Sequence, residues 1–200
     1  MRKKPVIKKI REVARSRLFS IEQVSLRFSN GNEACYERLA PASSDGAVIV
    51  AALQDSQTVL LIEEYSVGTE QYELVLPKGR MEPGETVLSA ANRELAEETG
   101  FAARSLTHLA DIAVAPGYMS FKTSLVLAED LYPCQLQGDE PEPLVVVPWL
   151  LSDLFELCHE KGCREGRTIA ALYMVRDYIA RRVGGTVPGI IKEYKEIENE

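Results

Sequence analysis

Residues 79–101 read GRMEPGETVLSAANRELAEETGF, and this stretch holds the most specific pattern in the chain. Its apolar side chains recur at the spacing of one helical face, at Val87, Leu88, Ala91 and Leu95. Gly84 stands just before the pattern, and Gly100 supplies the stop signal that commonly ends a helix. The stretch therefore predicts a helix from Glu85 to about Thr99.

Three acids share one face of this predicted helix. Glu94, Glu97 and Glu98 stand at i, i+3 and i+4, which places their carboxylates about 5–6 Å apart. Like charges at these spacings destabilise a helix by about 0.2–0.5 kcal/mol per pair, and the macrodipole disfavours negative charge in its second half. For Glu97 and Glu98 alone, a solvated helix face is the simpler interpretation. The full arrangement favours a divalent cation site, because oxygen-only ligands suit Mg²⁺ or Mn²⁺.

The overall charge supports the same interpretation. The 200 residues carry a formal net charge of -7, which argues against a nucleic-acid partner because phosphate contacts favour a basic face. This charge would also repel an anionic substrate, unless bound cations invert the local field. Arg93 precedes the acids, and its fork of donors can hold Glu85 or a neighbouring carboxylate in place. Gly79 and Gly84 permit a tight loop that leaves carbonyls free for a metal.

Four cysteines are too few and too scattered for a disulfide framework in a chain of this length. A zinc site at Cys158, His159 and Cys163 is disfavoured because the chain has only two histidines, and ordinary thiols at a helix end are expected instead. No apolar run reaches the roughly 18 residues of a membrane span, and no apolar signal-peptide segment follows the basic start. We therefore expect a cytoplasmic protein with no membrane partner.

Apolar runs and helical spacings predict the remaining elements. Strands are expected at Ala47–Leu53, Thr58–Ile62, Tyr72–Leu76, Leu109–Val114, Lys122–Leu127 and Leu144–Trp149, and helices at Leu151–His159 and from about Arg167 to Arg182. The order mixes strands and helices without regular alternation. The chain is therefore predicted to be an α/β protein with a mixed sheet flanked by helices.

The N-terminal part is expected to form an antiparallel β-hairpin appendage. Apolar residues alternate between Phe19 and Phe28, and Asn30-Gly31 is a hairpin signal. The expected divisions are an appendage at 1–44, a main domain at 45–183 and a polar tail at 184–200. A small hairpin cannot stabilise itself alone, so it must pack on the rest of the chain or on a second copy, and a homodimer is favoured. The basic residues of the first seventeen positions fit either attraction of phosphates or a lysine-protected edge strand.

The stretch at residues 79–101 resembles the Nudix box, G-x5-E-x7-R-E-U-x-E-E-x-G-U, in which U is a bulky apolar residue. Every specified position agrees: Gly79, Glu85, Arg93, Glu94, Leu95, Glu97, Glu98, Gly100 and Phe101. The resemblance implies an α/β/α sandwich and a hydrolase of nucleoside diphosphates linked to another moiety. It implies metal ligands at three glutamates and one backbone carbonyl: Glu94, Glu98, Glu97 and the carbonyl of Lys78. Glu85 and Arg93 would support them, with Mg²⁺ as the cofactor and Mn²⁺ as the alternative.

Further segments resemble the ADP-ribose pyrophosphatase branch of the family: ERLAP at 37–41, EEYSVGTEQYELVLPKG at 63–79, GDEPEP at 138–143, and Pro116 beyond the box. Within this branch the chain is most similar to bacterial enzymes that act on several ADP compounds. The resemblance implies release of AMP from ADP-ribose, NADH or diadenosine oligophosphates, and a dimer through exchanged N-terminal strands. ADP-ribose specialists more commonly carry a small residue in place of Lys78, so strict specificity for ADP-ribose is not expected.

The resemblance also implies a catalytic base on a mobile acidic loop after the sheet, and residues 139–143, DEPEP, fit this loop. Glu140 is the expected base and Glu142 an auxiliary metal ligand, with a solvated acidic turn as the alternative. Contacts to adenine or ribose are expected from four residues, each of which has a purely structural role as its alternative: Tyr36, Arg38, Glu73 and Tyr118.

Two other functions stay open on the sequence alone. The first is a Nudix enzyme of another class, such as a nucleoside triphosphate or mRNA-cap hydrolase, against which Pro116 and the long N-terminal hairpin weigh. The second is a non-catalytic Nudix domain that senses a ligand. Such domains usually lose acids of the box, and here none is missing. Magnesium-dependent release of AMP would exclude this second function.

Overall fold

The N-terminal segment folds as a three-stranded antiparallel sheet. The computed structural model describes residues 2–41 and 46–184, and the first of these ranges contains β1 (Val6–Arg15), β2 (Ser20–Arg27) and β3 (Glu33–Leu39) in the order β1-β2-β3. The predicted hairpin corresponds to β2 and β3, and β1 is an edge strand, which was one of the two interpretations of the basic N-terminal residues. All ten residues of β1 are exposed, so no alternation of buried and exposed positions distinguishes this edge strand in the sequence.

The second sheet has seven strands: β4 (Ala47–Leu53), β5 (Thr58–Ser66), β6 (Gln71–Val75), β7 (Lys78–Arg80), β8 (Phe101–Ala113), β9 (Lys122–Pro133) and β10 (Val145–Leu150). Its main path is β10-β5-β4-β9-β8, with β6 paired to β5 and β7 paired to β4. The β4–β9 pair is parallel and the other pairs are antiparallel, so the sheet is mixed as predicted.

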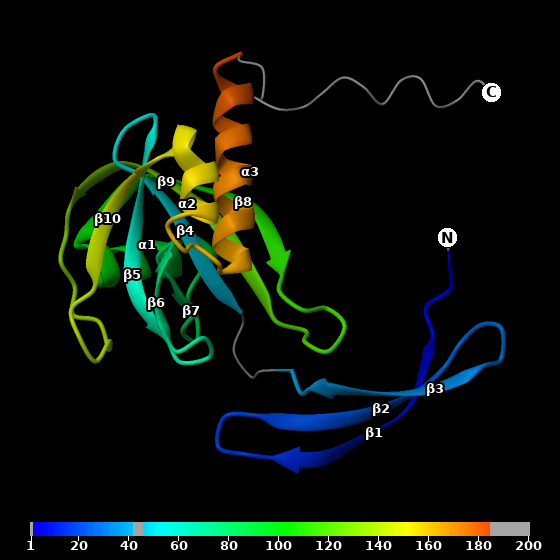
Figure 1. Cartoon of the computed structure of the whole chain (residues 1–200). Coiled ribbons are helices and arrows are strands. Elements are labelled where there is room, and N and C mark those ends of the chain that lie inside the picture. Colours follow the sequence, from blue (N-terminus) through cyan, green and yellow to red (C-terminus); the bar gives the residue numbers. More distant parts are fainter. Residues whose placement is uncertain (1, 42–45, 185–200) are drawn as a thin grey trace, which may run out of the picture.

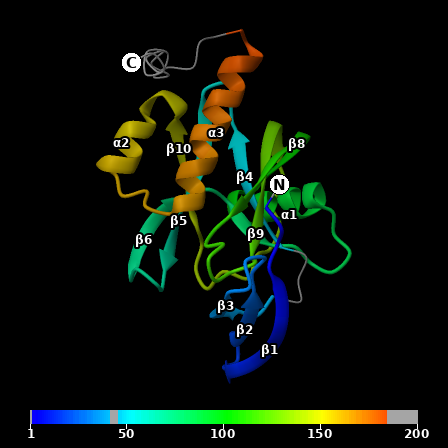
Figure 2. The same cartoon turned by 90° about the vertical axis from the view of Figure 1, so that its right-hand side faces the viewer.

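The helices cover both faces of this sheet. Helix α1 (Val87–Thr99) lies on one face, and α2 (Leu154–His159) and α3 (Gly166–Arg182) lie on the other, as Figures 1 and 2 show. All seven residues of β4 are buried, and those from Val48 to Leu53 alternate between two core clusters. The cluster that includes Ile49 also contains residues of α2 and α3, whereas the cluster that includes Val48 contains residues of α1. The predicted α/β/α sandwich is confirmed.

The central strand β4 changes its partner halfway along. It pairs with β5 only through Ala52 and Leu53, whereas Ala47, Val48 and Ile49 pair with the short strand β7. Strands β4 and β5 therefore diverge, and β7 lies in the opening between them. This opening is where the acidic residues of α1 gather.

The N-terminal sheet meets the main sheet through few contacts. The backbone N–H of Leu39 donates to the carbonyl of Tyr118 at 2.9 Å, and a cavity of about 660 Å³ lies between the first β-turn and the β8–β9 connection. Eight large apolar side chains of this sheet and its turns are exposed: Val6, Ile7, Ile10, Val13, Leu18, Phe19, Phe28 and Tyr36. In Figure 1 the sheet extends below the sandwich.

Each predicted strand and helix of the main domain overlaps an observed one, but several observed strands are longer than predicted. Strand β4 matches its prediction to the residue, whereas β5 and β8 extend well beyond the predicted ends. No helix among the described residues is long and apolar enough to cross a membrane. The proposed boundary between residues 44 and 45 and the tail after Gly184 lie outside the described residues.

Candidate active site

The acid-bearing helix α1 has a defined start and end. Thr86 and Ser89 form a reciprocal cap, in which Ser89 N–H donates to Thr86 Oγ1 at 3.1 Å and Thr86 N–H donates to Ser89 Oγ at 2.9 Å. Gly100 ends the helix with a φ of 77°, which favours glycine. The apolar face of α1 packs on the sheet through Ala91 and Leu95. This packing fixes the direction in which the glutamates of α1 point.

Strand β7 lies directly against the acids of α1. The backbone N–H of Lys78 donates to Glu98 Oε2 at 2.9 Å. At the next position, a Cβ on Gly79 would overlap the carboxylate of Glu94, so this close approach admits only glycine unless Glu94 moves. The box glycine therefore serves a steric purpose, and the segment of Lys78 and Gly79 forms one wall of the site.

Arg93 organises the acids through five hydrogen bonds. Its Nε and Nη2 donate to the two oxygens of Glu85 at 2.8 and 2.9 Å. Its Nη1 donates to Glu94 Oε1 at 2.8 Å and to Glu97 Oε2 at 2.9 Å, and Nη2 also donates to the carbonyl of Arg80 at 2.9 Å. The hydrogen bonds from Arg93 hold the pKa of Glu85 below its usual value. The expected supporting pair of Glu85 and Arg93 is thus brought together by the structure.

Two of the acids are buried, and their pKa values are raised. Glu94 and Glu98 are each 8% exposed. Burial raises the pKa of Glu98 to about 8, and the nearby charge of Glu94 adds to this increase while Lys78 opposes it. Burial is also the main cause of the raised pKa of Glu94, with further contributions from Glu97 and Glu140. Adjacent buried carboxylates of this kind are expected where a cation can neutralise them.

The donor set fits a hard divalent cation. In the present arrangement, residues 2–41 and 46–184 contain no group of three or more His, Cys, Asp or Glu side chains close enough to hold a metal ion. Arg93 and the Lys78 N–H instead bind one oxygen each of Glu94, Glu97 and Glu98. The second oxygen of each carboxylate has no hydrogen-bond partner among the described residues and is not sealed from solvent. Oxygen donors of this kind suit Mg²⁺ or Mn²⁺.

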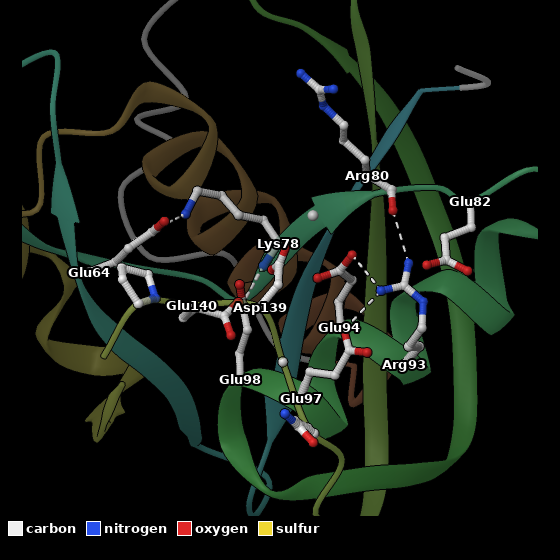
Figure 3. Close-up of a pocket in the computed structure, with 14 residues that line it drawn as sticks. Glu64, Lys78, Arg80, Glu82, Arg93, Glu94, Glu97, Glu98, Asp139 and Glu140 are labelled. Atoms are coloured by element: carbon white, nitrogen blue, oxygen red, sulfur yellow. Dashed lines mark hydrogen bonds and ion pairs between the residues drawn. The ribbon is translucent and has the colours of Figure 1, made fainter. Parts of the chain in front are cut away.

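A cavity of about 740 Å³ opens over these acids (Figure 3). It lies between β7, the end of β5, the acidic face of α1 and the loop before β10. The residues that line it are Glu64, Lys78, Gly79, Arg80, Glu82, Arg93, Glu94, Glu97, Glu98, Gln137, Gly138, Asp139, Glu140 and Pro141. Glu140, the expected base, thus reaches the cavity from a separate segment of the chain.

Several expected site residues lie outside this cavity. Glu142 accepts a hydrogen bond from the hydroxyl of Tyr72 at 2.7 Å and is not among the lining residues. The four expected substrate contacts also lie elsewhere. Tyr36 is exposed on β3, and Tyr118 is exposed in the β8–β9 connection. Arg38 forms an ion pair with Glu22 at 2.9 Å, and the buried carboxylate of Glu73 accepts a hydrogen bond from the hydroxyl of Thr69 at 2.6 Å. None of these five side chains lines the cavity that holds Glu94, Glu97 and Glu98.

The cavity also contains residues that sequence reasoning did not identify, chiefly Glu64 and Arg80, whereas Asp139 belongs to the acidic loop expected from the sequence. Glu64 lies on the part of β5 that the prediction left out, and its carboxylate binds the ammonium of Lys78. The period-two alternation of β5 past Ile62 would have placed Glu64 on the same face as Leu60, which packs against α1. The pairing with Lys78 itself depends on tertiary structure.

The chain belongs to the Nudix family and is a Nudix hydrolase. Residues 44–153 match the NUDIX domain, and residues 5–38 match the NudE-type Nudix hydrolase N-terminal domain. The family and the branch expected from the sequence are confirmed by these matches and by the relatives described next.

Three known proteins are similar over much of the chain. ADP compounds hydrolase NudE of Escherichia coli (strain K12) is 48% identical over 176 residues, which cover 88% of this chain and 94% of that protein. ADP-ribose pyrophosphatase of Bacillus subtilis (strain 168) is 30% identical over 129 residues, covering 64% and 70% of the two chains. A solved structure described as "Crystal structure of ADP compounds hydrolase" superposes with a TM-score of 0.85 at 46% identity, covering 93% of this chain and 99% of that one.

Proposed function

We propose that this protein hydrolyses the pyrophosphate bond of ADP-linked compounds, namely ADP-ribose, NADH and diadenosine oligophosphates, and releases AMP. The observation that carries the proposal is the cavity in which the buried acids of α1 meet the loop of Glu140. The high identity to a protein named ADP compounds hydrolase, over nearly its whole length, supports the choice of substrate class. For ADP-ribose the second product is ribose 5-phosphate.

Glu94, Glu97 and Glu98, together with the backbone carbonyl of Lys78, are the groups that would hold Mg²⁺ or Mn²⁺. When bound, these cations neutralise the diphosphate and lower the pKa of a coordinated water. Glu85 and Arg93 position the acids, because the guanidinium fixes one oxygen each of Glu94 and Glu97 and is itself held by Glu85. The second oxygens are thereby directed toward the cavity.

Glu140 is the proposed base. It lines the cavity, and its charge contributes to the raised pKa of Glu94, so its carboxylate is close to the acidic face of α1. In the proposed reaction its carboxylate accepts a proton from the attacking water, whose oxygen bonds to one phosphorus while the bridging P–O bond breaks. The bridging oxygen leaves with the second phosphate. Glu142, whose Oε1 accepts the hydrogen bond from the Tyr72 hydroxyl, would act as an auxiliary ligand only after moving into the cavity.

The proposed substrate contacts require a second copy of the chain or a closing movement. Tyr36 and Arg38 lie on β3 of the N-terminal sheet, away from the cavity of the same protomer. The eight exposed apolar side chains of that sheet and its turns support a homodimer built on the N-terminal strands, since pairing with a second copy would bury them. In such a dimer one sheet can approach the partner's cavity. The cytoplasmic location also stays a prediction.

Product analysis in ¹⁸O-labelled water tests the proposed function. The protein is incubated with Mg²⁺ and one substrate at a time: ADP-ribose, NADH or diadenosine triphosphate. The products are separated and their masses are measured by mass spectrometry. Release of AMP that depends on Mg²⁺ is expected, with the label showing which phosphorus was attacked. Turnover of nucleoside triphosphates or capped RNA in preference to all three would replace the proposal with another Nudix activity. Binding without any turnover would replace it with a ligand sensor.

A further inference from the structure

The cavity contains three basic side chains in different situations. Arg93 is fully engaged by the acids and by the carbonyl of Arg80. The guanidinium of Arg80 points away from the glutamates in Figure 3. The ammonium of Lys78 lies inside the cavity, where the carboxylate of Glu64 is its one recorded partner within the described part of the chain. The ammonium of Lys78 is therefore a cation inside the cavity that does not bind the acids of α1.

The backbone functions of Lys78 do not require a lysine. Its N–H binds Glu98 and its carbonyl is the proposed metal ligand, and any residue except proline supplies both groups. The lysine side chain is only 15% exposed, whereas its partner Glu64 is 37% exposed. A partly buried ion pair contributes little net stability, because desolvation offsets the attraction. A role in stability therefore does not explain the placement of this ammonium in a substrate cavity.

We propose that Lys78 binds a non-bridging phosphate oxygen of the substrate and that Glu64 holds the ammonium in place until the substrate arrives. The inference rests on the proposed function only in requiring a diphosphate in this cavity. A lysine ammonium is a mobile point charge on a flexible stem, so it can exchange one anionic partner for another. Because Lys78 extends from β7, beside the acids of α1, it contacts the diphosphate from the β5 side.

This exchange predicts opposite effects from removing the two partners. Lys78→Met removes a charge-assisted hydrogen bond and is expected to weaken diphosphate binding about 10- to 100-fold. Glu64→Gln removes the competing anion and is expected to tighten binding about two- to fivefold. If the Lys78–Glu64 pair served structure alone, both variants would change the affinity for the diphosphate in the same direction. The substitution that keeps the cation, Lys78→Arg, should retain much of the affinity lost in Lys78→Met.

Calorimetric titration of the full-length protein with inorganic pyrophosphate in Mg²⁺ measures the dissociation constant of the diphosphate for each variant. The KM for ADP-ribose gives a second readout. The surface pair Lys161–Glu156, at 3.7 Å, offers matched controls in Lys161→Met and Glu156→Gln, which should leave both values unchanged. Denaturation curves confirm that each variant is folded. Weaker binding in Lys78→Met with tighter binding in Glu64→Gln supports the inference.

Three results would overturn the inference: changes in the same direction for both variants, an unchanged dissociation constant in Lys78→Met, or no pyrophosphate binding by the unaltered protein at millimolar concentration. The outcome is separable from that of the proposed function. Pyrophosphate binding that depends on Lys78, without hydrolysis of ADP compounds, would remove only the proposed function. Hydrolysis of ADP-ribose with an unchanged KM in Lys78→Met would remove only the role of Lys78.

Discussion

Replacing Arg93 tests how the acidic site is held together. Arg93→Met keeps an unbranched stem of similar length but removes the guanidinium and all five of its hydrogen bonds. The change leaves Glu85, Glu94 and Glu97 without their shared cation. Losing one partner of a largely buried charge cluster is expected to lower the free energy of unfolding by about 2–4 kcal/mol. For a chain of this size, that corresponds to a decrease in Tm of roughly 5–15 °C.

Chemical denaturation with and without Mg²⁺ is the assay. Divalent cations that bind the same acids replace part of the lost positive charge, so Mg²⁺ should raise the denaturation midpoint of Arg93→Met more than that of the unaltered protein. Arg104→Met provides a control, because Arg104 pairs with Asp130 at 3.2 Å on the exposed surface, and it should change the free energy of unfolding by less than about 0.5 kcal/mol. If Arg93→Met lowered the free energy of unfolding no more than Arg104→Met does, Arg93 would not be the residue that holds the acidic site together.

Three further predictions concern the buried acid, the base and the N-terminal sheet. The pKa of Glu98 is raised from 4.5 to about 8 in the folded, metal-free protein. The stability that this group contributes is therefore complete below about pH 4.5 and is lost as the pH rises through 8. Urea midpoints measured without Mg²⁺ should fall across this pH range, and Glu98→Gln should reduce the fall. Glu140→Gln should lower kcat by about 10²–10⁴-fold with little change in the KM for ADP-ribose, whereas an unchanged kcat in steady-state assays would assign the base elsewhere. Replacing Ile7 and Ile10 by lysine should convert a dimer to a monomer in light scattering, and a monomeric unaltered protein would contradict the proposed interface.

The sandwich was predictable because its signals are local. Every side chain of β4 is buried, which produces a continuous apolar run, and α3 shows the helical spacing of a helix with one buried face. Strand β1 gave no such signal, since all its residues are exposed, and β7 is only three residues long. The edge strand β1 therefore remained one of two interpretations of the basic N-terminal residues. The end of β5 was placed too early and the start of β8 too late.

The helical part of the site was predictable for a similar reason. Glu94 and Glu98 lie on one helix, so their spacing in the sequence determines their spacing in the structure. Glu64 and Glu140 reach the cavity from segments that are distant in the chain, and only the fold brings them to α1. The hydrogen bond between Tyr72 and Glu142 likewise joins residues 70 positions apart, and no local pattern indicates it.

We infer that the buried acids of α1 lie together because divalent cations neutralise them. Anomalous diffraction from crystals grown or soaked with Mn²⁺ tests this claim most directly. We expect a manganese peak about 2.0–2.3 Å from carboxylate oxygens of Glu94 and Glu98, with the carbonyl of Lys78 also in contact. A protein that cleaves ADP-ribose in Mn²⁺ but shows no anomalous peak beside α1, even with a nucleotide bound, would contradict it.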